Sequence, residues 1–171
     1  CSSDLDHVMS NEAMPINCAS CSDEEVGRQM SNFAHTPFVF RGREYASVEG
    51  FYQGIKFPEE EKRIKIAAMH GVYARSAGKK AKTKQTTFDG QTFMMGSPEH
   101  HAVMKEAIRC KMEQHPEITK AFVATRPRPI IHDTGRPARK SAFPVEVFCQ
   151  IIGEMREEFA IQMANSGNAS E

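Results

Sequence analysis

The chain has 171 residues, of which 40% are hydrophobic and 26% charged, and these values are ordinary for one globular domain. Its 22 basic and 22 acidic residues balance at a pI near 7.2, which argues against a protein whose main task is to bind the phosphate backbone of nucleic acid. No apolar run reaches the roughly 18 residues that span a bilayer, and the N-terminus lacks a secretory signal pattern. We therefore expect a single compact cytoplasmic domain without membrane contact.

The cysteine content favours reduced thiols. There are five cysteines, an odd number, which does not suggest a disulfide framework. Cys18 and Cys21 form one CxxC pair, but a zinc site needs two further ligands at matching spacing and the sequence offers none. We predict no metal and no cofactor, and leave the role of Cys18 and Cys21 open.

Both ends of the chain are polar and aperiodic, so residues 1–15 and 164–171 are expected to be flexible tails around a domain at 16–163. In the run FVFRGREY, at 38–45, a glycine separates two short apolar or aromatic segments, and this pattern predicts a β-hairpin. Ile130 and Ile131 add a short strand. Little sheet is expected in total.

Helices are signalled more strongly than strands. Ser47 and Ser97 can cap helices because their hydroxyls accept from free N-terminal amides, and Pro58 and Pro98 suit the first helical turn. Five helices are predicted, over residues 48–57, 58–70, 98–114, 117–124 and 144–163. The stretch 79–93 has no clear period and is expected to be a surface loop. The fold class is therefore α+β, mainly helical, in one compact domain with a small sheet or hairpin.

The segment SVEGFYQGIKF carries the clearest candidate site. On a helix that advances about 100° per residue, Glu49, Gln53 and Lys56 lie within about 60° of one another, beside a separate apolar arc. Glu49 and Lys56 are two turns apart, so their side chains can hold opposite ends of a small ligand. The alternative is the solvated face of an amphipathic helix. Gly50 and Gly54 weaken such a helix, and a close approach would explain their presence.

A second candidate is the sequence Ser31-Asn32-Phe33, placed in an apparent loop before the hairpin. The Asn32 side chain can donate and accept hydrogen bonds at once, and the Phe33 ring offers a flat face to a base or sugar. The alternative is a turn residue followed by a core aromatic.

Two further segments are weaker candidates. Arg75 and Gly78, in a run that ends with two lysines, suit phosphate oxygens because they offer a guanidinium and close backbone approach. Asp133 follows the short strand at Ile130 and Ile131, where loops often present catalytic groups. The alternatives are that the run at Arg75 is solvated surface, as most such runs are, and that Asp133 belongs to a plain surface turn, which the sequence favours at least as strongly. Three histidines in or directly after the predicted helix at 98–114 are expected to cap or decorate helices: His100, His101 and His115.

Four blocks of the sequence resemble the NADAR (YbiA-like) family. They are INCASCSDEEVGRQMSNF at 16–33, SVEGFYQGIKF at 47–57, YARSAGKK at 73–80 and VMKEAIRCKMEQHPEITKAFVAT at 103–125. The blocks occur in order over most of the chain and are jointly specific.

The resemblance implies a mainly helical α+β domain that cleaves an N-glycosidic bond to ribose. Substrates associated with the family are ribosylamino-pyrimidine intermediates of riboflavin biosynthesis and ADP-ribose attached to guanine. By position, Glu49 and Lys56 become catalytic candidates, together with Asp133. Residues that match the family's substrate pocket are Ser31, Asn32, Phe33, Gln53, Arg75 and Gly78.

One region departs from the family pattern. Many relatives carry a Trp-Gly segment before the last helix, whereas here residues 133–141 read DTGRPARKS and the chain contains no Trp. The resemblance therefore indicates a divergent member. Because a diphosphate needs cations, Arg136, Arg139 and Lys140 favour ADP-ribosylated guanine over the riboflavin intermediates.

Three functions are thus compared from the sequence. The first is an N-glycosidase that removes ADP-ribose from guanine or cleaves a riboflavin intermediate, and Lys56 would act in it as an acid or as a Schiff-base nucleophile. The second is a non-catalytic ADP-ribose or nucleotide-binding module. The third and weakest is a nucleic-acid-binding protein that uses the basic segment 79–84. The expected partner is a ribosylated small molecule or an ADP-ribosylated nucleic acid, with no obligate protein partner.

Overall fold

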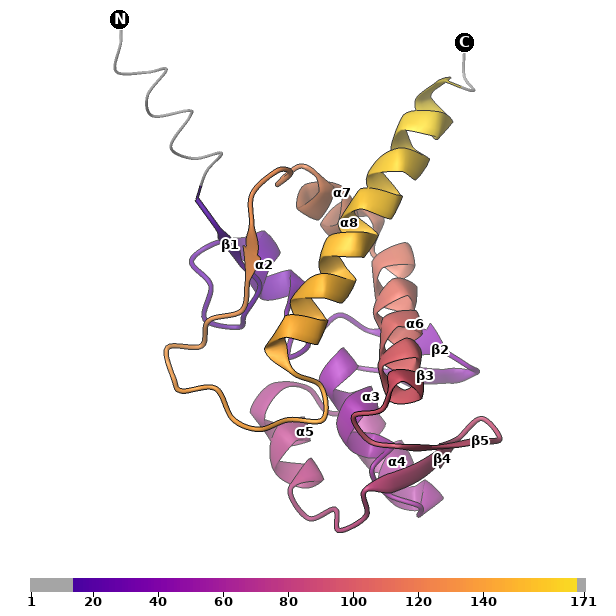
Figure 1. Ribbon diagram of the computed structural model, residues 1–171. Coiled ribbons are helices and arrows are strands. Elements are labelled where there is room, and N and C mark those ends of the chain that lie inside the picture. The colour runs from indigo at the N-terminus through magenta and orange to yellow at the C-terminus, as the bar shows by residue number, and fades with distance from the viewer. Residues whose placement is uncertain (1–13, 169–171) are drawn as a thin grey trace, which may run out of the picture.

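The computed structural model describes residues 14–168, so the parts of the predicted tails at 1–13 and 169–171 lie outside the described residues. Among these residues the structure has six strands of two to four residues, and helices contain most of the residues in regular secondary structure. The predicted α+β, mainly helical class is therefore confirmed (Figure 1). The helices are α2 (Glu25–Met30), α3 (Val48–Gly54), α4 (Glu60–Ala67), α5 (Gly71–Gly78), α6 (Pro98–Gln114), α7 (Pro116–Val123) and α8 (Val145–Asn168). The strands are β1 (Ile16–Asn17), β2 (Phe38–Phe40), β3 (Arg43–Tyr45), β4 (Gln85–Phe88), β5 (Gln91–Met94) and β6 (Ile130–Ile131).

The strands form separate pairs. β2 and β3 form the predicted hairpin, and its turn places Arg41 and Gly42 at positive φ. The predicted strand β6 pairs in parallel with β1, which no sequence pattern had indicated, because a strand of two residues is too short for alternation to be visible. This pairing brings the beginning of the domain beside the segment that leads to Asp133.

The prediction of a surface loop at 79–93 is wrong, because this stretch contains the antiparallel pair β4 and β5. Thr86 and Phe93 turn inward and are 6% and 4% exposed. Arg63 of α4 donates to the Thr87 carbonyl oxygen at 2.7 Å and to the Thr86 hydroxyl at 3.0 Å. Contacts with a distant helix therefore stabilise a hairpin whose sequence is largely polar.

Helix boundaries differ from the predicted ones in three places. The helix predicted over 58–70 is shorter, as α4, and α5 follows it as a separate helix that the sequence did not reveal. α3 ends at Gly54 rather than at Phe57. α8 continues past residue 163 to Asn168, so residues 164–168 are helical. The predictions for α6 and α7 hold to within one residue.

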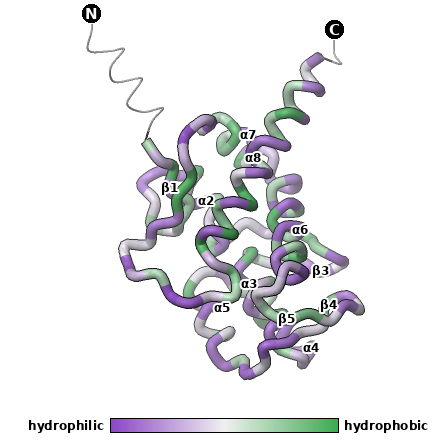
Figure 2. Tube along the Cα trace, viewed as in Figure 1, coloured by the Kyte–Doolittle hydropathy of each residue, from purple (hydrophilic) through white to green (hydrophobic). Residues whose placement is uncertain are grey.

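Helix α3 packs against α4, α5 and α6 in the lower half of the molecule as seen in Figure 1. Its Phe51 is fully buried, stacks on Phe40 at a centroid distance of 5.3 Å and meets the edge of Tyr45 at 5.2 Å. Hydrophobic segments recur along α6 and α8, as Figure 2 shows, and supply the other side of this core. In residues 14–168, no helix combines the length and apolar character that a membrane crossing requires.

The N-terminus of α3 is fixed by Ser47, which is fully buried. Its hydroxyl accepts from the Gly50 N–H at 2.9 Å and donates to the Met69 carbonyl oxygen at 2.9 Å. Replacing Ser47 by Ala removes both bonds, and we expect the free energy of unfolding in urea to fall by roughly 1–3 kcal/mol. Ser97→Ala is the matched control, because within residues 14–168 the Ser97 hydroxyl has only the cap bond, which it accepts from the His100 N–H at 3.2 Å. A loss at Ser47 no larger than at Ser97 would contradict the double role.

Candidate active site

The first candidate groups lie on α3, where Glu49 and Gln53 are one turn apart and both buried. Gln53 Nε2 donates to Glu49 Oε1 at 2.6 Å. Glu49 is only 7% exposed, and burial raises the pKa of its carboxyl above the ordinary value, although the Gln53 bond, Lys56 and Arg75 act in the opposite direction. The predicted pairing of Glu49 and Gln53 on one polar stripe is therefore present, but inside the protein rather than on a solvated face.

Lys56 follows α3 in a tighter turn, since its N–H donates to the Gln53 carbonyl oxygen at 3.3 Å. Its Nζ lies 4.4 Å from the centroid of the Tyr52 ring, a distance at which the ring attracts a cation. Burial lowers the pKa of the Lys56 ammonium, and the negative charge of Glu49 opposes this shift. Lys56 and Glu49 thus interact electrostatically, but the structure records no ion pair between them among the described residues.

Helix α5 brings Gly78 and Arg75 against α3. A Cβ added to Gly78 would lie 1.7 Å from Gln53 Oε1 and 2.4 Å from Gln53 Cδ, so only glycine permits this approach. Glycine is required at position 50 for a similar reason, because a Cβ added there would lie 2.7 Å from the Met69 carbonyl oxygen. The two glycines therefore set the packing distance between α3 and its neighbours.

The turn that contains Ser31, Asn32 and Phe33 borders the same place. The Asn32 carbonyl oxygen accepts from the Glu49 N–H at 2.9 Å, which joins the turn to the start of α3. The Arg75 guanidinium carbon lies 5.5 Å from the centroid of the Phe33 ring. Ser31 is buried, and its hydroxyl accepts from the Phe33 N–H at 3.2 Å. These contacts link the turn to both helices of the site.

Unused hydrogen-bonding capacity is concentrated around Glu49. Among the described residues, five buried side-chain polar atoms have no partner, and three of them belong to predicted site residues: Asn32 Oδ1, Gln53 Oε1 and Arg75 Nε. Buried polar groups are ordinarily hydrogen-bonded, and leaving one unpaired costs free energy. A ligand with several hydroxyl groups would supply the missing partners.

His100 is a fourth unpaired group and was not predicted as part of the site. Its Nδ1 accepts from the Gly96 N–H at 3.1 Å, so that Nε2 carries the proton and has no partner. The ring is fully buried at 5.7 Å from the Tyr52 ring, and burial lowers the pKa of His100 to about 4. The spacing of His100 from the buried Val103, Met104 and Ala107 was the sequence signal for this inward position.

Asp133 lies apart from these groups in the described contacts. Its carboxylate accepts from the Gly135 N–H at 2.8 Å, and its backbone N–H donates to Asn17 Oδ1 at 2.9 Å. Its carbonyl oxygen accepts from Asn17 Nδ2 at 2.9 Å and from Cys21 Sγ at 3.3 Å. The Asp133 side chain is exposed and closes its own turn, so its predicted catalytic role has no support from a contact with Glu49 or Lys56.

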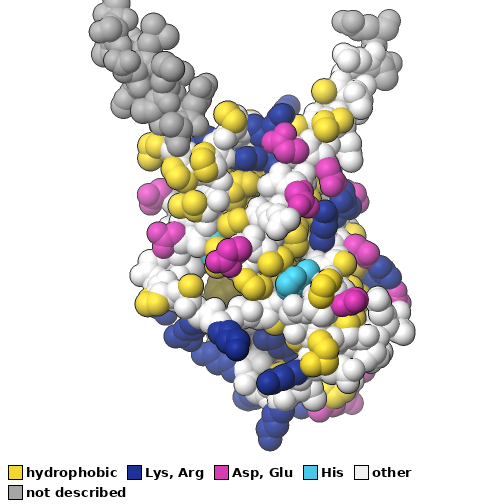
Figure 3. Space-filling view, viewed as in Figure 1, with side chains coloured by type: hydrophobic (Ala, Val, Ile, Leu, Met, Phe, Trp, Pro, Cys, Tyr) yellow, Lys and Arg dark blue, Asp and Glu magenta, His cyan; other side chains and the backbone are white. Residues whose placement is uncertain are grey.

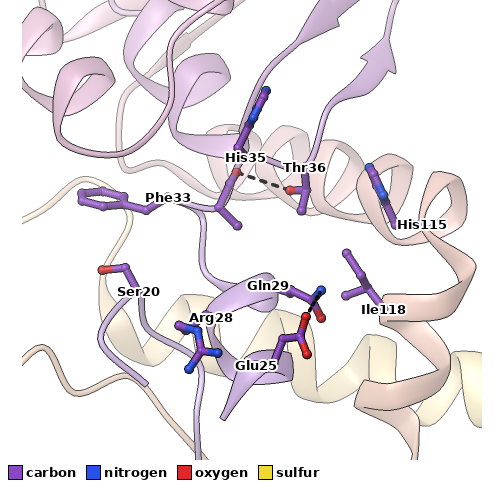
Figure 4. Close-up of a pocket in the computed structure, with 10 residues that line it drawn as sticks. Ser20, Glu25, Arg28, Gln29, Phe33, His35, Thr36, His115 and Ile118 are labelled. Atoms are coloured by element: carbon purple, nitrogen blue, oxygen red, sulfur yellow. Dashed lines mark hydrogen bonds between the residues drawn. The ribbon is translucent and has the colours of Figure 1, made fainter. Parts of the chain in front are cut away.

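An open cavity of about 460 Å³ adjoins the Ser31–Phe33 turn. Phe33 and Ser20 lie at one end of it and His115 and Ile118 at the other, with Arg28 and Gln29 between them (Figure 4). On the face seen in Figure 3, a hollow with hydrophobic side chains at its bottom is framed by the segment between β6 and α8. Phe33 therefore belongs both to the surroundings of Glu49 and to the wall of a space open to solvent.

Comparisons of sequence and structure identify relatives of the chain. Residues 26–157 match the family described as bacteriophage protein GP30.3. The N-glycosidase YbiA of Escherichia coli (strain K12) is 29% identical over 136 residues, 78% of either chain. A 17.1 kDa protein from the Gp30-rIII intergenic region of Enterobacteria phage T4 is 36% identical over 69 residues, 40% of this chain and 44% of its own length.

Among solved structures, the NMR structure of E. coli YbiA superimposes with a TM-score of 0.65 and 23% identity. The match covers 89% of this chain and 90% of that one, so the whole domain shares one fold. The chain therefore belongs to the bacteriophage protein GP30.3 family and is a YbiA-like member of the NADAR family.

Proposed function

We propose that the chain is a cytoplasmic N-glycosidase that releases ADP-ribose from ADP-ribosylated guanine, with Glu49 and Lys56 as catalytic residues. The observation that carries the proposal is the set of unpaired buried atoms on Asn32, Gln53 and Arg75 around the buried Glu49 carboxyl. A ribose offers hydroxyl groups that both donate and accept, which suits this mixed set. The relatives named N-glycosidase YbiA support the reaction class.

Glu49 is assigned the acid and the charge-stabilising role. Because burial raises the pKa of its carboxyl, a larger share of Glu49 holds a proton, which it can donate to the ring oxygen of the ribose as the ring opens. The carboxylate left behind then stabilises the positive charge on C1′. The Gln53 side chain fixes the orientation of the carboxyl through the 2.6 Å bond.

Lys56 is assigned the nucleophilic role, of the two that the sequence left open. Burial lowers the pKa of Lys56, and this increases the share of neutral amine, the form that attacks carbon. Nζ adds to C1′ of the opened sugar, the C1′–N bond to guanine breaks, and the proton released by the amine leaves with the base. Water then hydrolyses the C1′=Nζ imine and frees both the sugar and the lysine.

The substrate choice is supported by basic residues in the segment between β6 and α8. Arg136, Arg139 and Lys140 are exposed in the segment between β6 and α8, and lysine and arginine side chains gather at the lower end of the face in Figure 3. Cations at this position suit the diphosphate of ADP-ribose. Phe33, whose ring lies beside the Arg75 guanidinium, offers its face to a base or sugar. Ser31 binds the Phe33 N–H, and Gly78 permits the close approach of α5 to Gln53.

The test is to incubate the purified protein with ADP-ribosylated guanosine and ADP-ribosylated DNA in the presence of sodium borohydride. We expect release of unmodified guanosine or DNA and a reduced covalent ADP-ribose adduct on the peptide that contains Lys56, both identified by mass spectrometry. Lys56→Arg, which keeps the charge but cannot form an imine, should give neither product.

Other results would redirect the assignment. Cleavage without an adduct would make Lys56 an acid rather than a nucleophile. Cleavage of a ribosylamino-pyrimidine alone would assign the site to riboflavin intermediates. Binding of ADP-ribose without cleavage of either substrate would leave a nucleotide-binding module, and Asp133→Ala with unchanged turnover would remove Asp133 from the catalytic set.

A further inference from the structure

Lys111 is a buried cation that the proposed reaction does not use. It lies on α6 and is 1% exposed, among the largest fully buried side chains of the described residues. Within residues 14–168, its Nζ makes one recorded hydrogen bond, to the Ser31 carbonyl oxygen at 3.1 Å. The titratable group that acts on it is the Cys18 thiol, and burial raises the pKa of that thiol to about 12, so it remains neutral. Among the residues that the structure describes, Lys111 therefore has no negatively charged partner.

An ammonium in this position is unfavourable for folding. Burial lowers the pKa of Lys111 to about 7, which expresses the cost of keeping it charged away from water. The next residue, Met112, and the residues one and two turns before Lys111, Ile108 and Met104, are apolar and equally buried. A methionine would fill the space of the lysine stem without that cost, so stability alone does not explain the lysine.

The single hydrogen bond of Lys111 reaches the turn beside the catalytic carboxyl. The Ser31 carbonyl oxygen that accepts from Lys111 also accepts from the Ala34 N–H at 3.1 Å, which closes the turn. The next carbonyl, that of Asn32, accepts from the Glu49 N–H. Only one peptide unit thus separates the atom held by Lys111 from the atom bonded to Glu49, and the same turn carries the unpaired Asn32 Oδ1.

We infer that Lys111 is a positioning residue, which holds the Ser31–Phe33 turn so that the Asn32 side chain and the Phe33 ring face the substrate beside Glu49. The inference rests on the proposed function, since it assigns Lys111 to the same site. A donor on a long stem from α6 restrains the Ser31 carbonyl, the Glu49 N–H binds the Asn32 carbonyl, and the turn is thus held at both carbonyls.

The test compares Lys111→Met with wild type in thermal unfolding and in steady-state cleavage of ADP-ribosylated guanosine. We expect an unchanged or higher Tm together with a kcat/KM reduced roughly 10- to 100-fold, since a misplaced binding group loses about that much. Lys111→Gln, which keeps an N–H donor, should recover part of the loss. Arg156→Met is the control, because Arg156 is also a buried cation but donates to Thr125 Oγ1 at 3.1 Å and, among the described residues, has no recorded hydrogen bond to the turn. Its kcat/KM should equal that of wild type.

A double-mutant cycle separates positioning from general stability. In an Asn32→Ala background, where the turn no longer presents its side chain, Lys111→Met should reduce kcat/KM much less than in wild type. Equal losses in both backgrounds, full activity of Lys111→Met, or a Met variant that fails to fold would each contradict the inference.

Hydrogen exchange needs no substrate and therefore tests the role of Lys111 separately from the proposed reaction. The Glu49 backbone amide should exchange with deuterium at least about 10-fold faster in Lys111→Met than in wild type at equal Tm, because its acceptor on Asn32 is no longer held. Unchanged protection would overturn the role of Lys111 even if cleavage is confirmed. Faster exchange in a protein that cleaves nothing would retain the positioning contact and reject the proposed reaction.

Discussion

Glu49→Gln is expected to lower kcat/KM for the proposed cleavage by about 10²–10⁴-fold while the protein remains folded. The substitution keeps the size of the side chain and an oxygen that accepts from Gln53 Nε2, but it removes the proton and the negative charge that the proposed reaction needs. Steady-state cleavage of ADP-ribosylated guanosine measures the effect. Glu44→Gln is the matched control, since Glu44 is exposed on β3 and should leave activity unchanged. Wild-type activity in Glu49→Gln would exclude Glu49 from catalysis.

The stability of Glu49→Gln relative to wild type is also expected to depend on pH. The carboxyl of Glu49 has a raised pKa in the native state, above the ordinary 4.5 of the unfolded state. Between these two values the native protein binds a proton that the unfolded chain does not, so the stability of wild type falls as pH rises through this window. Glu49→Gln lacks this loss. We therefore expect the variant to gain stability relative to wild type from pH 4.5 upward, as measured by urea unfolding at each pH.

Gly78→Ala is expected to disturb both activity and folding. The added Cβ would lie 1.7 Å from Gln53 Oε1, 2.4 Å from Cδ and 3.0 Å from Cβ, so that moving the end of the Gln53 side chain does not relieve the clash. Either Gln53 leaves Glu49 or α5 moves away from α3. We expect kcat/KM to fall more than about 10-fold and the free energy of unfolding to fall by about 1–3 kcal/mol.

The control for this prediction is Gly153→Ala on α8. Its added Cβ meets Ile130 Cδ1 at 3.6 Å, an ordinary contact, and alanine is the better helix former by about 0.5–1 kcal/mol. This variant should be as stable as wild type or more so, with full activity. If Gly78→Ala behaves in the same way, the close packing of α5 on α3 is not required for the site.

Local signals predicted the parts of the fold that local interactions stabilise. Ser97 and Pro98 placed the start of α6 at the correct residue, because the cap bond to His100 N–H lies within the helix's own first turn. The β4–β5 hairpin was missed although Asp89 and Gly90 are a favoured turn pair, since its strands are polar and depend on Arg63. Helix α5 is short and is stabilised by its packing on α3.

In the candidate site, too, contacts within one helix could be predicted and contacts between distant segments could not. Glu49 and Gln53 could be predicted to lie together because one helix carries both. That Arg75 and Asn32 join them came from the family resemblance alone, since the contacts span distant segments. Lys111 shares the apolar face of α6 with Ala107 and Ile108, so spacing could indicate its inward position. Its hydrogen-bond partner could not be predicted, because Ser31 lies far away along the chain.

The parallel pairing of β1 with β6 has a consequence for synthesis of the protein. Ile16 and Asn17 find their partners only at Ile130 and Ile131, so the first segment of the domain to be translated has no strand to join until most of the chain has been made. Helices α3 to α6 can assemble earlier from neighbouring segments. The start of the domain therefore docks onto a nearly complete body, and a nascent chain arrested before residue 130 would leave Ile16 exposed to solvent and to proteases.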